Sequence, residues 1–197
     1  KDILVLKKLK IDYLYLPPSN QIYPHGSNKK IIINSFEKKL CGKFRPGHFK
    51  AVVDVIERFI NIIHPKNIYL GEKDMQQLKL IEDFVKKKYN KIKVIACKTI
   101  RGKNGVALSS RNLFLSTKEK RIAAKVYKIL INKKKYLIKK KISLSRIKNK
   151  ILELGVRKVD YIKLLDINNL INPYNKNEKY KIFIAYYLET TRLIDNI

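Results

Sequence analysis

The apolar residues in the middle of the chain change spacing several times, and these changes predict alternating helices and strands. From Gly47 to Pro65, apolar residues recur every three or four positions, as one face of an amphipathic helix requires. Short apolar runs at 67–70 and 92–97 predict strands, and a second amphipathic helix, 76–88, lies between them. Because strand–helix–strand units are nearly always right-handed with parallel strands, the sequence predicts a parallel sheet here.

The N-terminal residues predict further elements before this unit. Residues 4–10 have apolar positions at helical spacing, and 11–16 is a β-rich run that ends at Pro17, which cannot continue a hydrogen-bonded ladder. Residues 19–30 contain proline and glycine and predict a loop. We therefore expect a helix, a strand and a loop, in this order.

The second half of the chain predicts two helices with recognisable ends. Ser116 stands three residues before Glu119, the spacing of a capping box, and opens a helix that we expect to reach about residue 133. A lysine-rich connection follows, and then a helix near 145–154 that ends at Gly155, a residue type favoured just after a helix. Both helices lie outside the strand–helix–strand unit.

Two longer strands, 159–166 and 180–188, follow these helices, and an asparagine-rich loop, 168–179, joins them. Because the pattern changes after the last strand of the parallel unit, we expect a domain boundary at this point. The expected architecture is α/β, with a parallel-sheet domain at 1–98 and a smaller α+β domain at 99–197.

The chain is strongly basic, with a formal net charge of +29. Such a charge is typical of proteins that bind nucleic acids or anionic membranes. However, only eight of the 45 basic residues are arginines, the type favoured for bidentate phosphate and base contacts. The lysine excess also accompanies many Ile, Asn and Tyr residues and no Trp, as in proteins from AT-rich genomes. We therefore expect no nucleic-acid partner, with a polyanion-binding surface as the alternative.

Neither a membrane segment nor a protein-held metal is predicted. No apolar run approaches the roughly 18–20 residues that span a bilayer, and the first residues lack the pattern of a signal peptide. Cys41 and Cys97 are too few and too far apart to indicate a disulfide framework or a zinc site. We expect a cytoplasmic protein with two free thiols.

Three short polar clusters depart from the amphipathic pattern. The first, 44–49, reads Phe-Arg-Pro-Gly-His-Phe and lies just before a predicted helix. Arg45 offers a planar guanidinium to a phosphate or carboxylate, and Gly47 lets a ligand approach the helix N-terminus, whose free N–H groups favour anions. The alternative is an ordinary helix entry with a surface arginine and a packed His48.

The second polar cluster, 71–77, reads Gly-Glu-Lys-Asp-Met-Gln-Gln and directly follows a predicted strand, where ligands of parallel sheets bind. Gly71 permits close backbone approach to a nucleotide. Lys73 can neutralise charge on a transferring phosphorus centre, and Asp74 can orient it or hold a ribose hydroxyl. Gln77, one helical turn on, shares a face with Asp74. The alternative is a strand-to-helix turn with a solvated lysine.

The third polar cluster, 107–112, reads Ala-Leu-Ser-Ser-Arg-Asn and lies between a glycine-containing turn and a capped helix. The hydroxyls of Ser109 and Ser110 and the guanidinium of Arg111 can surround triphosphate oxygens from several sides. Hydrogen bonds to charged groups of this kind contribute roughly 1.5–3 kcal/mol each. The alternative is a polar loop without a ligand.

In this order and spacing, the three clusters resemble the pantothenate synthetases, which are pantoate–β-alanine ligases. The second cluster begins 26 residues after Arg45, and 22–26, 159–161 and 192–196 also match family segments. The resemblance covers nearly the whole chain and is weakest at 133–150. It implies a Rossmann-like, nucleotidyltransferase-type parallel sheet with a smaller α+β lid domain at the C-terminus.

The resemblance also implies an activity. Members of this family are cytoplasmic homodimers that act in coenzyme A biosynthesis. They activate pantoate with ATP and Mg²⁺ to pantoyl adenylate and pyrophosphate, and the amine of β-alanine then attacks the acyl carbon to give pantothenate and AMP. The implied partners of this chain are therefore pantoate, β-alanine, MgATP and a second copy of itself.

Each matching position carries an implied role. The ATP-binding positions are Gly71, Glu72, Lys73, Asp74, Ile100, Leu108, Ser109, Ser110 and Arg111. The catalytic positions among them are Lys73, on the phosphates, and Ser109, Ser110 and Arg111, in the lid segment that closes over the triphosphate. The backbone of Ile100 is expected to meet the adenine. Gln77 is expected to bind pantoate, and Arg45 and His48 are expected at the edge of the active site.

One family segment has no counterpart in this sequence. The segment Met-Gly-x-Leu-His-x-Gly-His, whose histidines hold ATP phosphates in the family, is absent, and His25, His48 and His64 lie in no such pattern. We therefore expect the Rossmann-like domain to be N-terminally incomplete and this chain alone to show little activity. A truncated, inactive remnant of the ligase is the first alternative, and a basic nucleic-acid-binding protein is the second.

Overall fold

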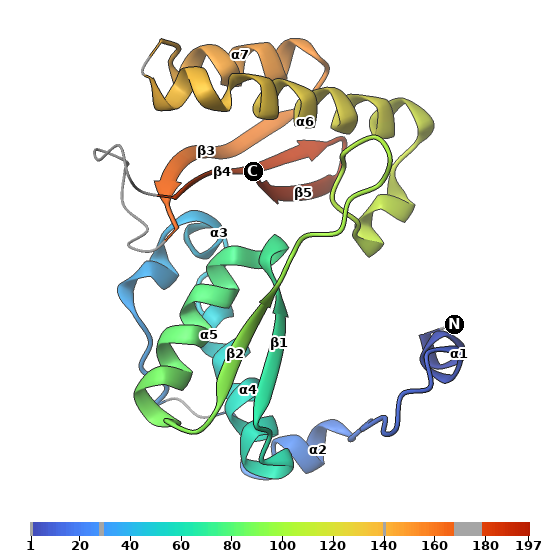
Figure 1. Ribbon diagram of the computed structural model, residues 1–197, viewed down its shortest axis with the longest axis vertical. Helices are drawn as coiled ribbons and strands as arrows, with labels where there is room; N and C mark the ends of the chain where they lie inside the picture. The colour runs from blue at the N-terminus through green and yellow to red at the C-terminus, as the bar shows by residue number, and fades with distance from the viewer. Residues whose placement is uncertain (1, 28–29, 140, 168–178) are drawn as a thin grey trace.

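Two sheets organise the protein, for which a computed structural model describes residues 2–27, 30–139, 141–167 and 179–197 (Figure 1). The strands are β1 (Asn67–Gly71), β2 (Lys93–Cys97), β3 (Lys158–Asp166), β4 (Tyr180–Leu188) and β5 (Thr191–Asn196). The helices are α1 (Asp2–Lys8), α2 (Ser19–Ile22), α3 (Leu40–Lys43), α4 (His48–Ile63), α5 (Met75–Lys88), α6 (Thr117–Ile138) and α7 (Leu144–Glu153). Short 3₁₀ turns occupy Ser35–Lys38, Glu72–Asp74 and Ser110–Phe114.

The predicted parallel unit is confirmed. Strands β1 and β2 pair in parallel, with Asn67 opposite Lys93, and α5 connects them. The apolar faces of α4 and α5 pack on one face of this sheet, where Val53 and Ile81 are almost fully buried. The loop after β1 carries the second polar cluster. It therefore lies at the carboxyl end of the parallel sheet, where ligands of such sheets bind.

The C-terminal sheet is antiparallel, with β4 between β3 and β5. Alternate residues of β4 point to opposite faces, as in any strand. Ile182 and Ile184 belong to the cluster formed with α6 and α7, whereas Phe183 belongs to a second cluster with Met75 and Leu78 of α5. The antiparallel sheet is therefore a middle layer between the two C-terminal helices and the parallel unit, as Figure 1 shows.

The predicted helix ends are confirmed, although one helix is longer than expected. Ser116 and Glu119 form a capping box at the start of α6, and Gly155 follows α7 with a φ of +93°, a conformation that favours glycine. Helix α6 continues to Ile138 because the lysine-rich tract does not break it: lysine is a good helix former, and Leu137 is buried in the core.

Two predictions near the N-terminus are wrong. Residues 11–16 form no strand; they pair with no described residue, and Tyr13 is 92% exposed. A β-rich composition forms a strand only where another strand supplies hydrogen bonds, and no described strand pairs with these residues. Part of the predicted loop forms the short helix α2 instead. In the C-terminal half, β5 was not predicted, and 168–178 of the predicted loop lies outside the described residues.

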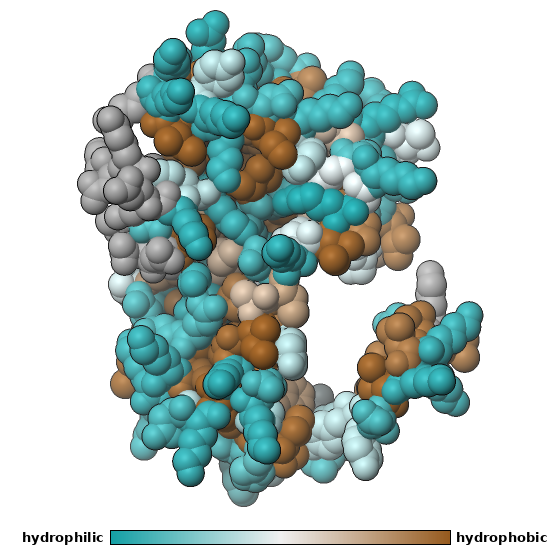
Figure 2. All heavy atoms as spheres, in the orientation of Figure 1, coloured by the Kyte–Doolittle hydropathy of each residue, from teal (hydrophilic) through white to brown (hydrophobic). Residues whose placement is uncertain are grey.

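The N-terminal segment, residues 2–16, is mostly exposed, and Tyr15 joins it to α4 through an edge-to-face contact with Phe59 at 6.2 Å. Helix α1 has no buried residue, and Leu4 and Leu16 are more than half exposed. Figure 2 shows this segment as a separate group of atoms with apolar side chains on its surface. It contributes nothing to the site described below.

Candidate active site

The first polar cluster is held in place by a buried glutamine on α5. The Nε2 atom of Gln76 donates hydrogen bonds to the carbonyl oxygens of Phe36 and Lys39, at 2.9 and 2.7 Å, and its Oε1 atom accepts one from the backbone N–H of Cys41 at 3.0 Å. Gln76 is only 5% exposed. This residue therefore fixes on α5 the segment that leads to Arg45.

The start of α4 faces a cavity. Gly47 occupies the N-cap position with a φ of +76°, a conformation that favours glycine, and no side chain caps the first N–H groups. Arg45 and His48 both line the cavity. Burial and the neighbouring Arg45 lower the pKa of His48 below its ordinary value, although Asp74 acts in the opposite direction. The arrangement favours an anion at this helix end.

The second polar cluster forms a 3₁₀ turn between β1 and α5, and its side chains separate into two groups. Lys73, Asp74 and Gln77 line the cavity, with the Lys73 Nζ atom 3.7 Å from Asp74 Oδ2. The carboxylate of Glu72 instead forms an ion pair of 2.9 Å with Lys181 of β4. Gly71 has an extended backbone with a φ of −72°, which any residue can adopt, and the space beside its Cα is open.

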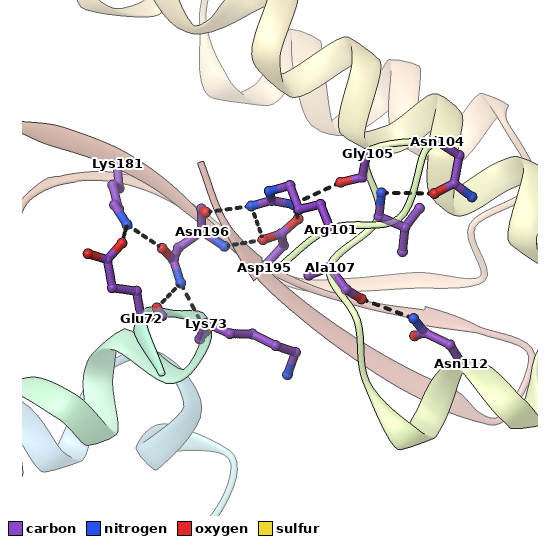
Figure 3. Close-up of polar contacts among 11 residues, drawn as sticks. Glu72, Lys73, Arg101, Asn104, Gly105, Ala107, Asn112, Lys181, Asp195 and Asn196 are labelled. Carbon is purple, nitrogen blue, oxygen red and sulfur yellow. Dashed lines mark hydrogen bonds and ion pairs between the residues drawn. The ribbon is translucent and has the colours of Figure 1, made fainter. Parts of the chain in front are cut away.

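The third polar cluster is joined to the end of β5 by an arginine (Figure 3). Arg101 forms a bidentate pair with Asp195, at 2.8 and 2.9 Å, and also donates to the carbonyl oxygens of Gly105 and Asn196. Its guanidinium lies over the ring of Tyr127 of α6 at 4.8 Å. A planar guanidinium suits this combination of bidentate pairing and stacking. Arg101 therefore anchors the start of the segment that carries Ser109 and Arg111.

Within that segment, the backbone brings Ile100 and Leu108 together. The N–H group of Leu108 donates to the carbonyl oxygen of Ile100 at 2.9 Å, and both side chains are more than half exposed. Ser109 caps the following 3₁₀ turn by accepting from the N–H group of Arg111. The guanidinium of Arg111 then donates to the carbonyl oxygen of Arg192 on β5 at 3.1 Å.

The structure brings most of the predicted side chains to one place. A cavity of about 240 Å³ between the two sheets is lined by Arg45, His48, Lys73, Asp74, Gln77 and Arg111, among others. A small adjoining hollow of about 20 Å³ is lined by Lys73, Ser109 and Arg111. The predicted positions that line neither space are Gly71, Glu72, Ile100, Leu108 and Ser110.

Several lining residues lie outside the three polar clusters and were not predicted. Arg192 lies 2.9 Å from Asp160 through its Nε atom, and its remaining nitrogens face the Cys41 thiol. The hydroxyl of Tyr161 is 3.0 Å from the same sulfur, and burial raises the pKa of this hydroxyl, as does the neighbouring thiol. A signal existed, because 159–161 and 192–196 match family segments, but neither was given a role.

The chemistry of the cavity favours a polyanion or a carboxylate. Arg45, Lys73, Arg111 and Arg192 line it, whereas Asp74 and Asp195 are the acidic residues there, and Asp195 is already paired with Arg101. The described residues contain no group of three or more His, Cys, Asp or Glu side chains that could hold a metal ion. In the described part of the chain, no helix is long and apolar enough to cross a membrane.

Comparison with known proteins identifies relatives along the whole chain. A family model described as pantoate-beta-alanine ligase matches residues 1–197. The pantothenate synthetase of Sulfurihydrogenibium is 34% identical over 203 residues, and that of Buchnera aphidicola is 40% identical over 205 residues; the match covers all of this chain and 72% and 71% of the relatives, respectively.

Solved structures agree with these relatives. The pantoate-beta-alanine ligase of Francisella tularensis, crystallised with β-γ ATP and β-alanine, is 35% identical and superposes with a TM-score of 0.79, covering 100% of this chain and 68% of that protein. The pantothenate synthetase of Thermus thermophilus is 27% identical with a TM-score of 0.86, covering 100% of this chain and 72% of that protein. The predicted α/β fold with a C-terminal lid is therefore confirmed.

Proposed function

Because the chain belongs to the pantoate-β-alanine ligase family, we propose that the cavity between its two sheets binds MgATP and pantoate and forms pantoyl adenylate. The family consists of ATP-dependent ligases that join pantoate to β-alanine. The observation that carries the proposal is that Lys73 and Gln77, from the second polar cluster, and Arg111, from the third, converge on one cavity.

In this proposal, the phosphates of ATP lie against Lys73 from the parallel unit and against Ser109, Ser110 and Arg111 from the C-terminal part. Support comes from the hollow lined by Lys73, Ser109 and Arg111. Preorganised cations of this kind stabilise the charge that develops on the α-phosphorus when a pantoate oxygen attacks it and pyrophosphate leaves. Closure of the lid excludes water from the mixed anhydride.

The remaining ATP contacts in this proposal come from exposed side chains, from the backbone and from one carboxylate. The exposed residues Ile100 and Leu108, joined by their backbone hydrogen bond, offer a surface for the adenine. The open space at Gly71 allows the nucleotide to approach β1. Asp74 orients the ATP from the cavity wall. Glu72 acts through its backbone in this proposal, because its carboxylate pairs with Lys181.

Pantoate and β-alanine occupy the part of the cavity formed by α4 and α5. Gln77 binds pantoate, and Arg45 and His48 lie at the edge where a carboxylate meets the start of α4. The pKa of His48 is lowered, which favours a neutral imidazole there at neutral pH. The amine of β-alanine then attacks the acyl carbon and AMP leaves.

Magnesium enters as part of MgATP. Mg²⁺ prefers oxygen ligands, retains water readily and is commonly held by substrate phosphates together with one or two carboxylates. The proposal therefore assigns it to the ATP phosphates and to no cage of protein ligands, with Asp74 as the carboxylate of the predicted loop that lines the cavity.

The wider properties implied by the family stay proposals. They are a cytoplasmic location, a homodimer, and a division into a nucleotide-binding domain at 1–98 and a lid domain at 99–197. Size-exclusion chromatography with light scattering tests the homodimer directly. A single-copy mass that does not change with concentration would contradict it.

The test of the function measures AMP, pyrophosphate and pantothenate after the chain is mixed with MgATP, pantoate and β-alanine. Whatever the rate, we expect AMP and pantothenate to form in equal amounts, and pyrophosphate to form only when pantoate is present. Lys73→Ala should lower the rate of adenylate formation about a hundredfold. The control is Lys79→Ala, because Lys79 pairs with Glu82 at 2.7 Å and does not line the cavity.

Two other outcomes have distinct meanings. ADP and phosphate as products, or an unchanged rate in Lys73→Ala, would contradict the proposal. Binding of MgATP and pantoate without AMP formation would support the ligand site and contradict the adenylation step.

A further inference from the structure

Asn196, the last residue of β5, contacts the loop that carries Lys73. Its Nδ2 atom donates two hydrogen bonds, to the carbonyl oxygen of Glu72 at 2.7 Å and to that of Lys73 at 2.9 Å (Figure 3). Asn196 is only 3% exposed. A side chain 123 residues further along the chain therefore determines where the backbone of this loop lies.

The partners of Asn196 also fix the orientation of its amide. The Oδ1 atom accepts a hydrogen bond from Lys181 Nζ at 3.0 Å, and the same ammonium pairs with the carboxylate of Glu72. With the amide reversed, its oxygen would face two carbonyl oxygens and its NH₂ group would face an ammonium. Only one orientation satisfies every partner, as buried amides require.

The loop needs such an external support. Glu72 and Lys73 lie in a three-residue 3₁₀ turn, which has poorer hydrogen-bond geometry than an α-helix, and no side chain caps the start of α5. The Lys73 amine contacts Asp74 only at 3.7 Å. The position of the lysine is therefore determined mainly by its backbone, which Asn196 holds.

Asn196 also reaches the lid segment. Its carbonyl oxygen accepts from Arg101, and its N–H group donates to Asp195, the bidentate partner of Arg101. Arg101 begins the segment that carries Ser109 and Arg111. One residue thus touches both the Lys73 loop and the anchor of the lid segment, which are the two sides of the proposed phosphate site.

We propose that Asn196 is a positioning residue for the ligase: it sets the Lys73 loop at the distance from the Arg101-anchored lid segment at which both bind the ATP phosphates. This inference rests on the proposed function, because it assumes that Lys73 binds ATP. Asn196 lines the cavity, but its amide is committed to Glu72, Lys73 and Lys181, so we expect its effect on ATP to pass through Lys73.

A double-mutant cycle on MgATP affinity tests this dependence, with isothermal titration calorimetry of the purified chain as the measurement. We expect Asn196→Ala to weaken MgATP binding about tenfold in the wild-type background, within the range for one hydrogen bond to a charged group. In the Lys73→Met background, the same substitution should change the affinity less than about twofold. Asn61→Ala is the matched control, because Asn61 lies on α4 and contacts Tyr89, away from the cavity.

The other outcomes separate this inference from the proposed function. An equal loss in both backgrounds, or no loss in either, would overturn the positioning role while leaving Lys73 as an ATP ligand. If Lys73→Met alone leaves the affinity unchanged, the proposed ATP site fails and the inference fails with it.

If Asn196→Ala does not fold, the isosteric Asn196→Asp takes its place in the cycle. That substitution keeps the contact with Lys181 and turns an oxygen toward the two carbonyl groups. Asn196→Asp should weaken MgATP binding in the wild-type background and much less in the Lys73→Met background. An equal loss of MgATP affinity in both backgrounds would overturn the proposal.

Discussion

The two sheets of this protein differ in how completely they are covered. Among the described residues, the helices cover one face of the parallel β1–β2 pair, and Tyr69 on the other face is 64% exposed. In the antiparallel sheet, Ile184 on one face of β4 and Ala185 on the other are fully buried. Within the described ranges, the parallel pair therefore has one covered face and the antiparallel sheet has two.

This difference shows where the support of the active site comes from. Lys73 follows a strand of the less covered sheet, but its loop is held by Asn196 and Lys181 of the fully covered one. The C-terminal sheet therefore acts as a rigid reference against which the phosphate-binding loop is placed. Substitutions in the two sheets should consequently have different effects on stability and on ligand affinity.

The largest expected effect on stability comes from the core of the antiparallel sheet. Ile184→Ala should lower the free energy of unfolding by about 2–5 kcal/mol, because a fully buried side chain leaves a cavity between β4 and the helices. The matched substitution Ile95→Ala, opposite the exposed Tyr69 in the parallel pair, should cost about 1 kcal/mol or less. Urea unfolding followed by circular dichroism measures both, and equal losses would remove the contrast between the sheets.

Two adjacent glutamines allow the residues that stabilise the fold to be distinguished from those that bind ligand. Gln76→Ala should lower the free energy of unfolding by about 2–3 kcal/mol, because it leaves the backbone groups of Phe36, Lys39 and Cys41 without their partner. Gln77→Ala, at the cavity wall, should cost less than about 0.5 kcal/mol but weaken pantoate binding. Urea unfolding measures the loss of stability in each variant, and calorimetric titration measures its affinity for pantoate. If Gln77→Ala instead lost the stability and Gln76→Ala lost the pantoate affinity, the assigned roles would be wrong.

The smallest expected effect is the pH dependence of His48. Since burial and Arg45 lower its pKa, the folded protein binds this proton less readily than the unfolded chain does. The free energy of unfolding should therefore rise with pH up to the ordinary imidazole pKa of about 6.5 and stay level above it. His48→Gln should flatten this slope between pH 5.5 and 7.5 in urea unfolding. An unchanged slope in His48→Gln would contradict this interpretation.

Local sequence patterns were sufficient to predict the longer helices, whose backbone hydrogen bonds lie within one segment. The helices α4, α5, α6 and α7 have regular apolar faces, caps or terminal glycines, and all four form as expected. The strand expected at 11–16 does not form, because strand formation depends on a neighbour that local sequence cannot reveal. The short strand β5 escaped prediction because its polar residues Arg192, Asp195 and Asn196 are committed to contacts with distant segments.

The candidate site likewise contains residues that the sequence predicts and residues whose contacts it does not. Lys73, Gln77 and Arg111 lie in motifs, and the structure places them at one cavity as expected. Gln77 was singled out from the sequence, but the buried role of Gln76 was not, because its partners Phe36, Lys39 and Cys41 are brought to it only by the fold. Glu72 lies in the same motif, yet its carboxylate pairs with Lys181, a contact between residues 109 positions apart.

The central claim is that both sheets contribute to one phosphate-binding site, and MgATP titration of matched variants tests it most directly. Lys73→Ala changes the parallel unit and Arg111→Ala changes the C-terminal part, and each removes a cation from the cavity. We expect each to weaken MgATP binding about tenfold or more, with Lys79→Ala unchanged. Wild-type affinity in either cavity variant would contradict the account, because the site would then need only one of the two regions.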